Sequence, residues 1–66
     1  MAWLARNKNN ILVVFNDNPS YDGYRYFREE QVESENFIDL GIELPPSADF
    51  KLLGRSITYV DGAIEI

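Results

Sequence analysis

Carboxylate side chains are the most abundant reactive groups of this 66-residue chain, and they are concentrated in one stretch. Residues 29–49 contain seven acidic residues and no basic residue. The pairs Glu29/Glu30 and Glu33/Glu35 could act as a general acid and base only in a cleft that shifted their pKa values. So small a domain rarely forms such a cleft, and no histidine or cysteine can activate a nucleophile. We therefore predict no enzymatic activity, no catalytic residue and no cofactor.

The segment Asn16–Gly23 offers several oxygen ligands at short spacing, which makes calcium the metal to consider. A helix–loop–helix calcium site that began at Asp17 would need a glutamate at its twelfth position. Arg28 occupies that position, and both flanks of the segment have strand-like patterns. We predict a turn-rich connector without a bound metal.

Two groups of residues are candidates for a partner surface. The first comprises Glu29, Glu30, Glu33 and Glu35, which could repel nucleic acid or occupy a basic groove on a partner. The alternative is a solvated face, the usual role of a charge run.

The second group comprises Tyr21, Tyr24, Tyr26 and Arg25. These side chains could stack on bases or form hot spots of a protein interface, or they could pack against each other across strands. The net charge of −5 and the lack of a basic run disfavour direct binding to nucleic acid. Another protein is therefore the expected partner.

The length and composition predict one small domain over residues 1–66. The chain is 45% hydrophobic and has no cysteine, so its core must form by apolar packing alone. A chain this short buries only roughly 60% of its unfolded surface, which leaves a monomer and a homo-oligomer equally open. The apolar runs Met1–Ala5 and Ile11–Phe15 are too short to span a membrane, and Met1–Phe15 does not have the ordered features of a signal peptide. We expect a cytoplasmic protein that does not bind membranes.

The first half of the chain has the pattern of strands. Ala2–Arg6 and Ile11–Asn16 predict a hairpin, and the continuous apolar run within the second strand predicts a central position in the sheet. After the connector, Gly23–Arg28 predicts another strand. Residues 29–36 are compatible with an extension of this strand or with a solvated loop. Four alternating apolar residues then predict a strand with one buried face: Ile38, Leu40, Ile42 and Leu44.

The last third predicts a short helix and a hairpin. Ser47 is suited to cap the helix N-terminus, Asp49 to interact with the helix dipole, and Gly54 to end the helix. Asp61-Gly62 predicts a type I′ turn that joins residues 57–60 to residues 63–66. The expected fold is mainly β, either small β or α+β. It has an antiparallel sheet of about five or six short strands and one short helix before a C-terminal β-hairpin.

The two ends of the chain resemble a group of short uncharacterised proteins encoded in bacterial prophages and mobile elements. The resemblance rests on Met1-Ala2-Trp3, Leu44-Pro45, Leu52-Leu53-Gly54-Arg55, Ile57-Thr58-Tyr59 and Glu65-Ile66. It is poor between Asn16 and Phe37 and carries over no functional residue. It implies a phage or mobile-element origin.

The leading functional hypothesis is a non-enzymatic protein-interaction module that binds a host or phage protein. One alternative is a structural component of an oligomeric or virion assembly, built through sheet edges. A second is an acidic inhibitor that occupies a nucleic-acid-binding groove.

Overall fold

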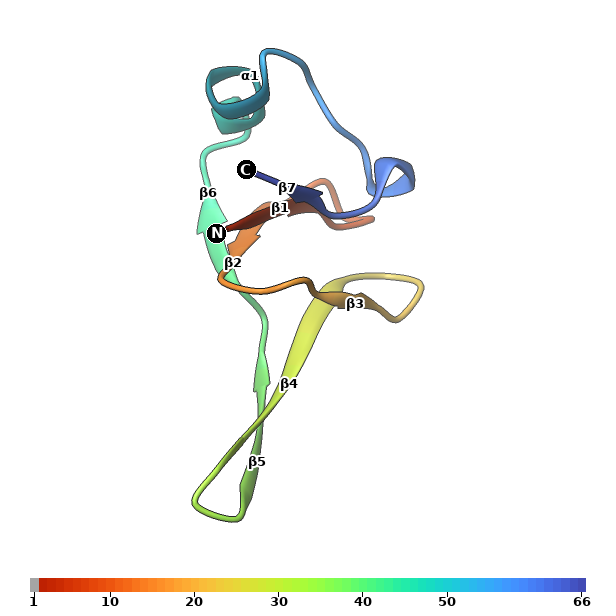
Figure 1. Cartoon of the computed structure of the whole chain (residues 1–66). Helices are drawn as coiled ribbons and strands as arrows, with labels where there is room; N and C mark the ends of the chain where they lie inside the picture. The colour runs from red at the N-terminus through yellow and green to blue at the C-terminus, as the bar shows by residue number, and fades with distance from the viewer. Residues whose placement is uncertain (1) are drawn as a thin grey trace.

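The computed structural model describes residues 2–66, which form two antiparallel sheets and one short α-helix (Figure 1). The strands are β1 (Trp3–Arg6), β2 (Leu12–Phe15), β3 (Ser20–Tyr21), β4 (Tyr26–Val32), β5 (Glu35–Asp39), β6 (Ile42–Leu44) and β7 (Ile64–Glu65). The helix α1 spans Ala48–Leu53, and a 3-10 helix spans Tyr59–Asp61. The predicted mainly β fold with one short helix is confirmed, with seven short strands. No helix within residues 2–66 is long and apolar enough to cross a membrane.

The β1–β2 hairpin is the centre of a four-stranded sheet with the order β6-β2-β1-β7. Its register pairs Trp3 with Phe15 and Arg6 with Leu12. The tight connector includes Asn10 at a φ of 76°, a left-handed conformation that asparagine tolerates well. The predicted hairpin and the central position of its second strand are both confirmed.

Both faces of this sheet are covered, because successive side chains of a strand point to opposite faces. One face packs against β4 and the other against α1 and the segment after it. The first core cluster contains Ala5, Val13, Phe15 and Tyr26. The second contains Leu4, Leu12 and Ile57, with Ala48 and Leu53 of α1 packed beside them. Two-sided burial explains why the apolar run of β2 is continuous rather than alternating.

The strands β4 and β5 form a long hairpin that projects away from the four-stranded sheet (Figure 1). The four-stranded sheet, α1 and the segment after α1 are called the body here. The body and the hairpin together measure 40 × 24 × 17 Å. Of the two alternatives for residues 29–36, the extended strand is correct, since β4 continues to Val32. A two-residue turn at Glu33 and Ser34 then returns the chain into β5.

The prediction of one strand with a buried face between Ile38 and Leu44 is wrong. The strand is divided at Gly41, whose φ of 80° turns the chain out of β5 and into β6. Ile38 and Ile42 are 56% and 70% exposed. Their alternation is strand-like, but Ile38 lies on the projecting hairpin and Ile42 at the start of the edge strand β6, and each side chain is left mostly in solvent.

The predicted C-terminal hairpin is also wrong. The carboxylate of Asp61 accepts a hydrogen bond from the Thr58 N–H at 2.7 Å, and the Thr58 hydroxyl accepts one from the Val60 N–H at 3.3 Å. This reciprocal cap stabilises the 3-10 helix in place of a type I′ turn. The last strand, β7, pairs with β1 instead, with Ile64 opposite Leu4.

The helix α1 begins after Ser47 and ends at Gly54 in the left-handed conformation, as predicted. The Ser47 side chain makes no capping hydrogen bond, so this part of the prediction is wrong. Asp49 does lie in the first turn, but its carboxylate points into the protein and is 1% exposed.

We expect Gly41→Ala to destabilise the protein by about 2–5 kcal/mol. A Cβ at position 41 would lie 2.9 Å from the Phe15 Cζ, so overpacking adds about 1–3 kcal/mol to the cost of about 1–2 kcal/mol for a left-handed alanine. Gly54→Ala is the matched control, because Gly54 has a similar φ of 76° and open space around it. Urea unfolding would measure both variants, and equal losses would contradict the close contact with Phe15.

Candidate interaction surface

The β4–β5 arm, defined here as residues 28–39, carries most of the net charge of the protein. It contains five acidic residues and one basic residue, which gives −4 of the total of −5. Its register places Glu29 opposite Ile38 and Glu30 opposite Phe37. Directly opposite residues share a face of a hairpin, so each face of the arm combines acidic and apolar side chains.

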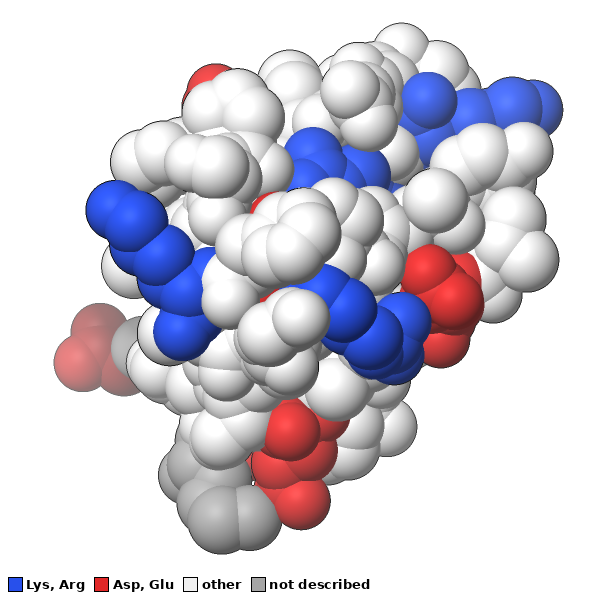
Figure 2. All heavy atoms as spheres, turned by 90° about the horizontal axis from the view of Figure 1, so that it is seen from above, with Lys and Arg blue, Asp and Glu red and all other residues white. Residues whose placement is uncertain are grey.

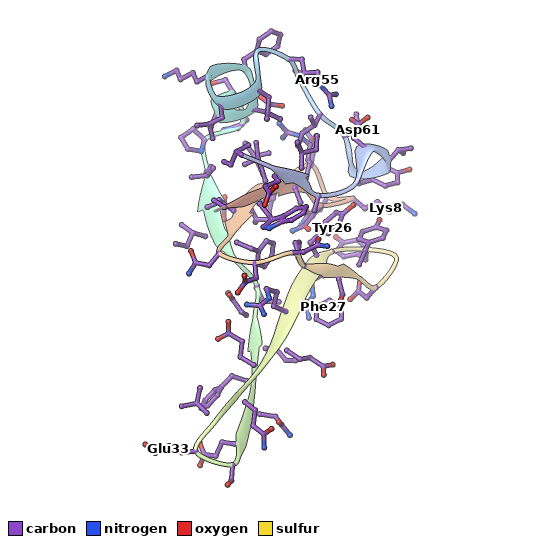
Figure 3. All side chains as sticks on the ribbon, in the orientation of Figure 1. Lys8, Tyr26, Phe27, Glu33, Arg55 and Asp61 are labelled. Carbon is purple, nitrogen blue, oxygen red and sulfur yellow. The ribbon has the colours of Figure 1, made fainter. Side chains whose placement is uncertain are left out.

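The apolar side chains of the arm are open to solvent. Val32, Phe37 and Ile38 are 54%, 49% and 56% exposed. Glu33 lies at the tip, far from the body (Figure 3). A two-stranded hairpin is marginally stable alone in water, and this one has no core of its own. The exposed apolar residues are therefore available to a partner.

Arg28 fixes the base of the arm. Its guanidinium lies 3.3 Å from a carboxylate oxygen of Asp17 and 3.0 Å from one of Glu30. Within residues 2–66, the carboxylates of Glu29, Glu33 and Glu35 form no ion pair. The negative charge of the outer arm is thus left uncompensated.

The second predicted group, Tyr21, Tyr24, Tyr26 and Arg25, lies in β3, at the start of β4 and in the turn between these strands, whereas Glu33 and Glu35 of the acidic group lie at the far end of the arm. Tyr26 is buried, and its hydroxyl donates a hydrogen bond to the Tyr59 carbonyl oxygen at 3.0 Å. The rings of Tyr21 and Tyr26 pack across strands with centroids 4.6 Å apart. Burial is the main cause of the raised pKa of Tyr26. The packing interpretation is correct for these two residues, and Tyr26 is only 5% exposed.

Asp22 organises the connector before β4. One of its carboxylate oxygens accepts hydrogen bonds from the N–H groups of Tyr24 and Arg25, at 2.9 and 2.8 Å. These two hydrogen bonds lower the pKa of the Asp22 carboxyl. Tyr24 and Arg25 are exposed beside it and remain possible contact residues. Within residues 2–66, no three acidic side chains lie close enough to hold a metal ion.

A hollow of about 260 Å³ lies at the joint between the arm and the body. Tyr24, Arg25, Leu40 and Glu43 are among the residues that line it. It is open to solvent, and its lining includes one carboxylate, from Glu43, and the phenol groups of Tyr24 and Tyr26.

The sequence interpretation missed the buried ion pair between Arg6 and Asp49, whose charged atoms lie 2.7 Å apart. Arg6 also donates hydrogen bonds to the carbonyl oxygens of Asn10, Pro46 and Ile57. The Asp49 carboxylate accepts the Ile57 N–H at 3.0 Å. Arg6 ends an apolar strand and precedes the polar connector, so the sequence gives no signal that its charge is buried and requires a partner.

This ion pair is structural, since both side chains are removed from solvent. The hydrogen bond from Arg6 is the main cause of the lowered pKa of Asp49, and the Ile57 N–H adds to it.

Figure 2, seen from the end opposite the arm, shows the exposed Lys and Arg side chains at separate places with uncharged atoms between them. This end therefore presents no continuous basic surface in that view.

Arg6→Met should lower the free energy of unfolding by about 3–5 kcal/mol, because the charge of Asp49 would stay buried without its partner. The double variant Arg6→Met/Asp49→Leu should recover at least half of this loss, since it removes both charges. Urea denaturation of the three proteins would measure the effect. A loss below about 1 kcal/mol for the single variant would contradict the structural role of the pair.

The stability should also fall in acid. The pKa of the Asp49 carboxyl is lowered below its usual value of 3.8, so its contribution is complete above that pH and is lost as the pH falls through the lower folded-state pKa. Melting temperatures at pH 2–7 would show a plateau above about pH 5 and a decline below about pH 4. Asp49→Asn should reduce the steepness of this decline. The same steepness in both proteins would contradict the assignment.

The described chain thus presents one projecting arm with mixed acidic and apolar faces, above a body held together by a buried ion pair. No protein-family model, curated protein or solved structure matches the chain.

Proposed function

We propose that this protein is a non-enzymatic interaction module that binds another protein through its β4–β5 arm. The observation that carries the proposal is the simultaneous exposure of Val32, Phe37 and Ile38 on a hairpin that has no core of its own. Covering these side chains would stabilise both the arm and the complex, since roughly 25 cal/mol is gained for each Å² of apolar surface removed from water.

The backbone at the tip supports this proposal. Glu33 and Ser34 have φ values of 51° and 70°, and a left-handed conformation is costly for either residue. The arm therefore combines an unfavourable turn with little internal packing. A partner that orders the arm would supply the missing stabilisation.

The resemblance of the two chain ends to prophage-encoded proteins supports an accessory role in a phage or mobile element, with a host or phage protein as the partner. A cytoplasmic location is part of the same proposal. The membrane and direct nucleic-acid binding are not part of it, because a net charge of −5 opposes association with anionic surfaces.

A structural component of an assembly is the second candidate. It is favoured by the position of β5 and β6, each of which lies at an edge of its sheet. An acidic inhibitor is the third candidate, favoured by the uncompensated carboxylates of the arm. A defined oligomer in light scattering would favour the second candidate. The third would be favoured by binding to a basic enzyme, if this binding is lost when four glutamates are changed to glutamine: Glu29, Glu30, Glu33 and Glu35.

The arm can be tested with a matched pair of double variants. Phe37→Ser/Ile38→Ser removes two of the three exposed apolar side chains of the arm, whereas Leu52→Ser/Val60→Ser removes apolar residues that are 50% and 77% exposed elsewhere. Both variants should keep the wild-type melting temperature within a few degrees, because exposed substitutions cost little. Affinity capture from bacterial lysate, quantified by mass spectrometry, would identify the partner with the wild-type protein.

The arm variant should lose at least tenfold of the captured partner, since two interface anchors typically contribute more than about 1 kcal/mol each. The control should retain it. Equal capture by the arm variant and the wild-type protein would overturn the proposed contact surface.

A further inference from the structure

The outer edge of β5 is unpaired along its whole length. β5 is the last strand in the order β3-β4-β5, and no other strand of residues 2–66 lies beyond it (Figure 1). An unpaired edge offers backbone donors and acceptors to any extended segment that approaches it.

The turn geometry shows which backbone groups of this edge are free. Glu33 and Ser34 both have positive φ, as in a two-residue type I′ turn, so the flanking pair Val32 and Glu35 is hydrogen-bonded. Hydrogen-bonded and non-hydrogen-bonded pairs alternate along an antiparallel ladder. Asn36 and Ile38 therefore belong to non-hydrogen-bonded pairs, and their N–H and C=O groups point outward.

The charges of the arm disfavour a second copy as the occupant of this edge. Any two-fold antiparallel pairing of β5 with itself brings two acidic arms together, and the register centred on Phe37 also places Glu35 opposite Asp39 twice. Like charges directly opposite each other are destabilising, and the two arms together would carry −8. The same positions favour an occupant with positive charge.

We propose that the free edge of β5 accepts, as an added strand, an extended segment of a partner protein with Lys or Arg at two positions four residues apart. The basic residues lie opposite Glu35 and Asp39, and apolar or β-branched residues between them lie opposite Phe37 and Ile38. This inference rests on the proposed function, because it specifies how the partner engages the arm.

The probe is the peptide acetyl-Lys-Ile-Val-Thr-Lys-amide, whose basic residues have the required separation in either strand direction. Its control is acetyl-Glu-Ile-Val-Thr-Glu-amide, which keeps the same apolar centre. In a titration of ¹⁵N-labelled protein followed by NMR, the basic peptide should bind saturably. The amides of Asn36 and Ile38 should shift most and become protected from hydrogen exchange. The acidic peptide should bind at least tenfold more weakly.

A pair of variants at position 36 separates the backbone from the side chain. Asn36→Pro removes the outward N–H, and proline is tolerated at an edge where that N–H does not pair. Asn36→Ala removes the side chain alone. The proline variant should bind the basic peptide at least tenfold more weakly than the alanine variant, with equal circular dichroism spectra.

Three results would overturn strand addition: no saturable binding by the wild-type protein, equal affinity for the two peptides, or shifts confined to residues outside the arm. Equal binding by folded Asn36→Pro and Asn36→Ala would also overturn it. If the peptide fails while Phe37→Ser/Ile38→Ser still loses the captured partner, strand addition fails and the interaction module stands. Retention of the partner by that double variant would instead overturn the arm as the contact surface.

Discussion

The buried ion pair between Arg6 and Asp49 is the interaction on which the body of this protein depends. Arg6 belongs to the first strand, and its guanidinium reaches the connector, the segment before α1, the helix itself and the segment after it. Such an arrangement adds little net free energy, because two charges must be removed from water. It does fix one geometry, since every other placement of the helix would leave a buried charge without a partner.

This constraint explains how so small a chain covers both faces of its central sheet. The ion pair holds α1 and the segment around Ile57 over one face, where Leu4 and Leu12 are fully buried. The other face is closed by Tyr26 at the start of β4. With the body complete, the rest of β4 and all of β5 have nothing further to cover, and they extend into solvent as the arm.

The arm and the body therefore follow different physical rules. The body buries its apolar side chains and pairs its buried charges. The arm exposes Phe37 and Ile38 and leaves most of its carboxylates uncompensated. The body therefore has a packed core, whereas the arm has few contacts that stabilise it. This contrast is the basis on which we propose an interaction module.

Local patterns in the sequence determined the elements whose physics is local. The β1–β2 hairpin, the left-handed Gly54 after the helix and the mainly β class follow from short-range periodicity and turn chemistry. The charge pattern also indicates the observed exposure of Glu33 and Glu35, because a charge that remains in solvent requires no tertiary partner.

The tertiary structure alone decided which faces are buried and which distant residues meet. Ile38 has the alternation of a half-buried strand, yet burial requires a covering element that no strand pattern can specify. Asp49 lies 43 residues from Arg6 in sequence, so no local rule connects them. Likewise, Asp61-Gly62 favours a hairpin turn by itself, but the competing local capping box of Thr58 and Asp61 forms instead. The pairing of β7 with the distant β1 is the tertiary contribution, and it can outweigh a turn preference because each local preference is worth only about 1 kcal/mol.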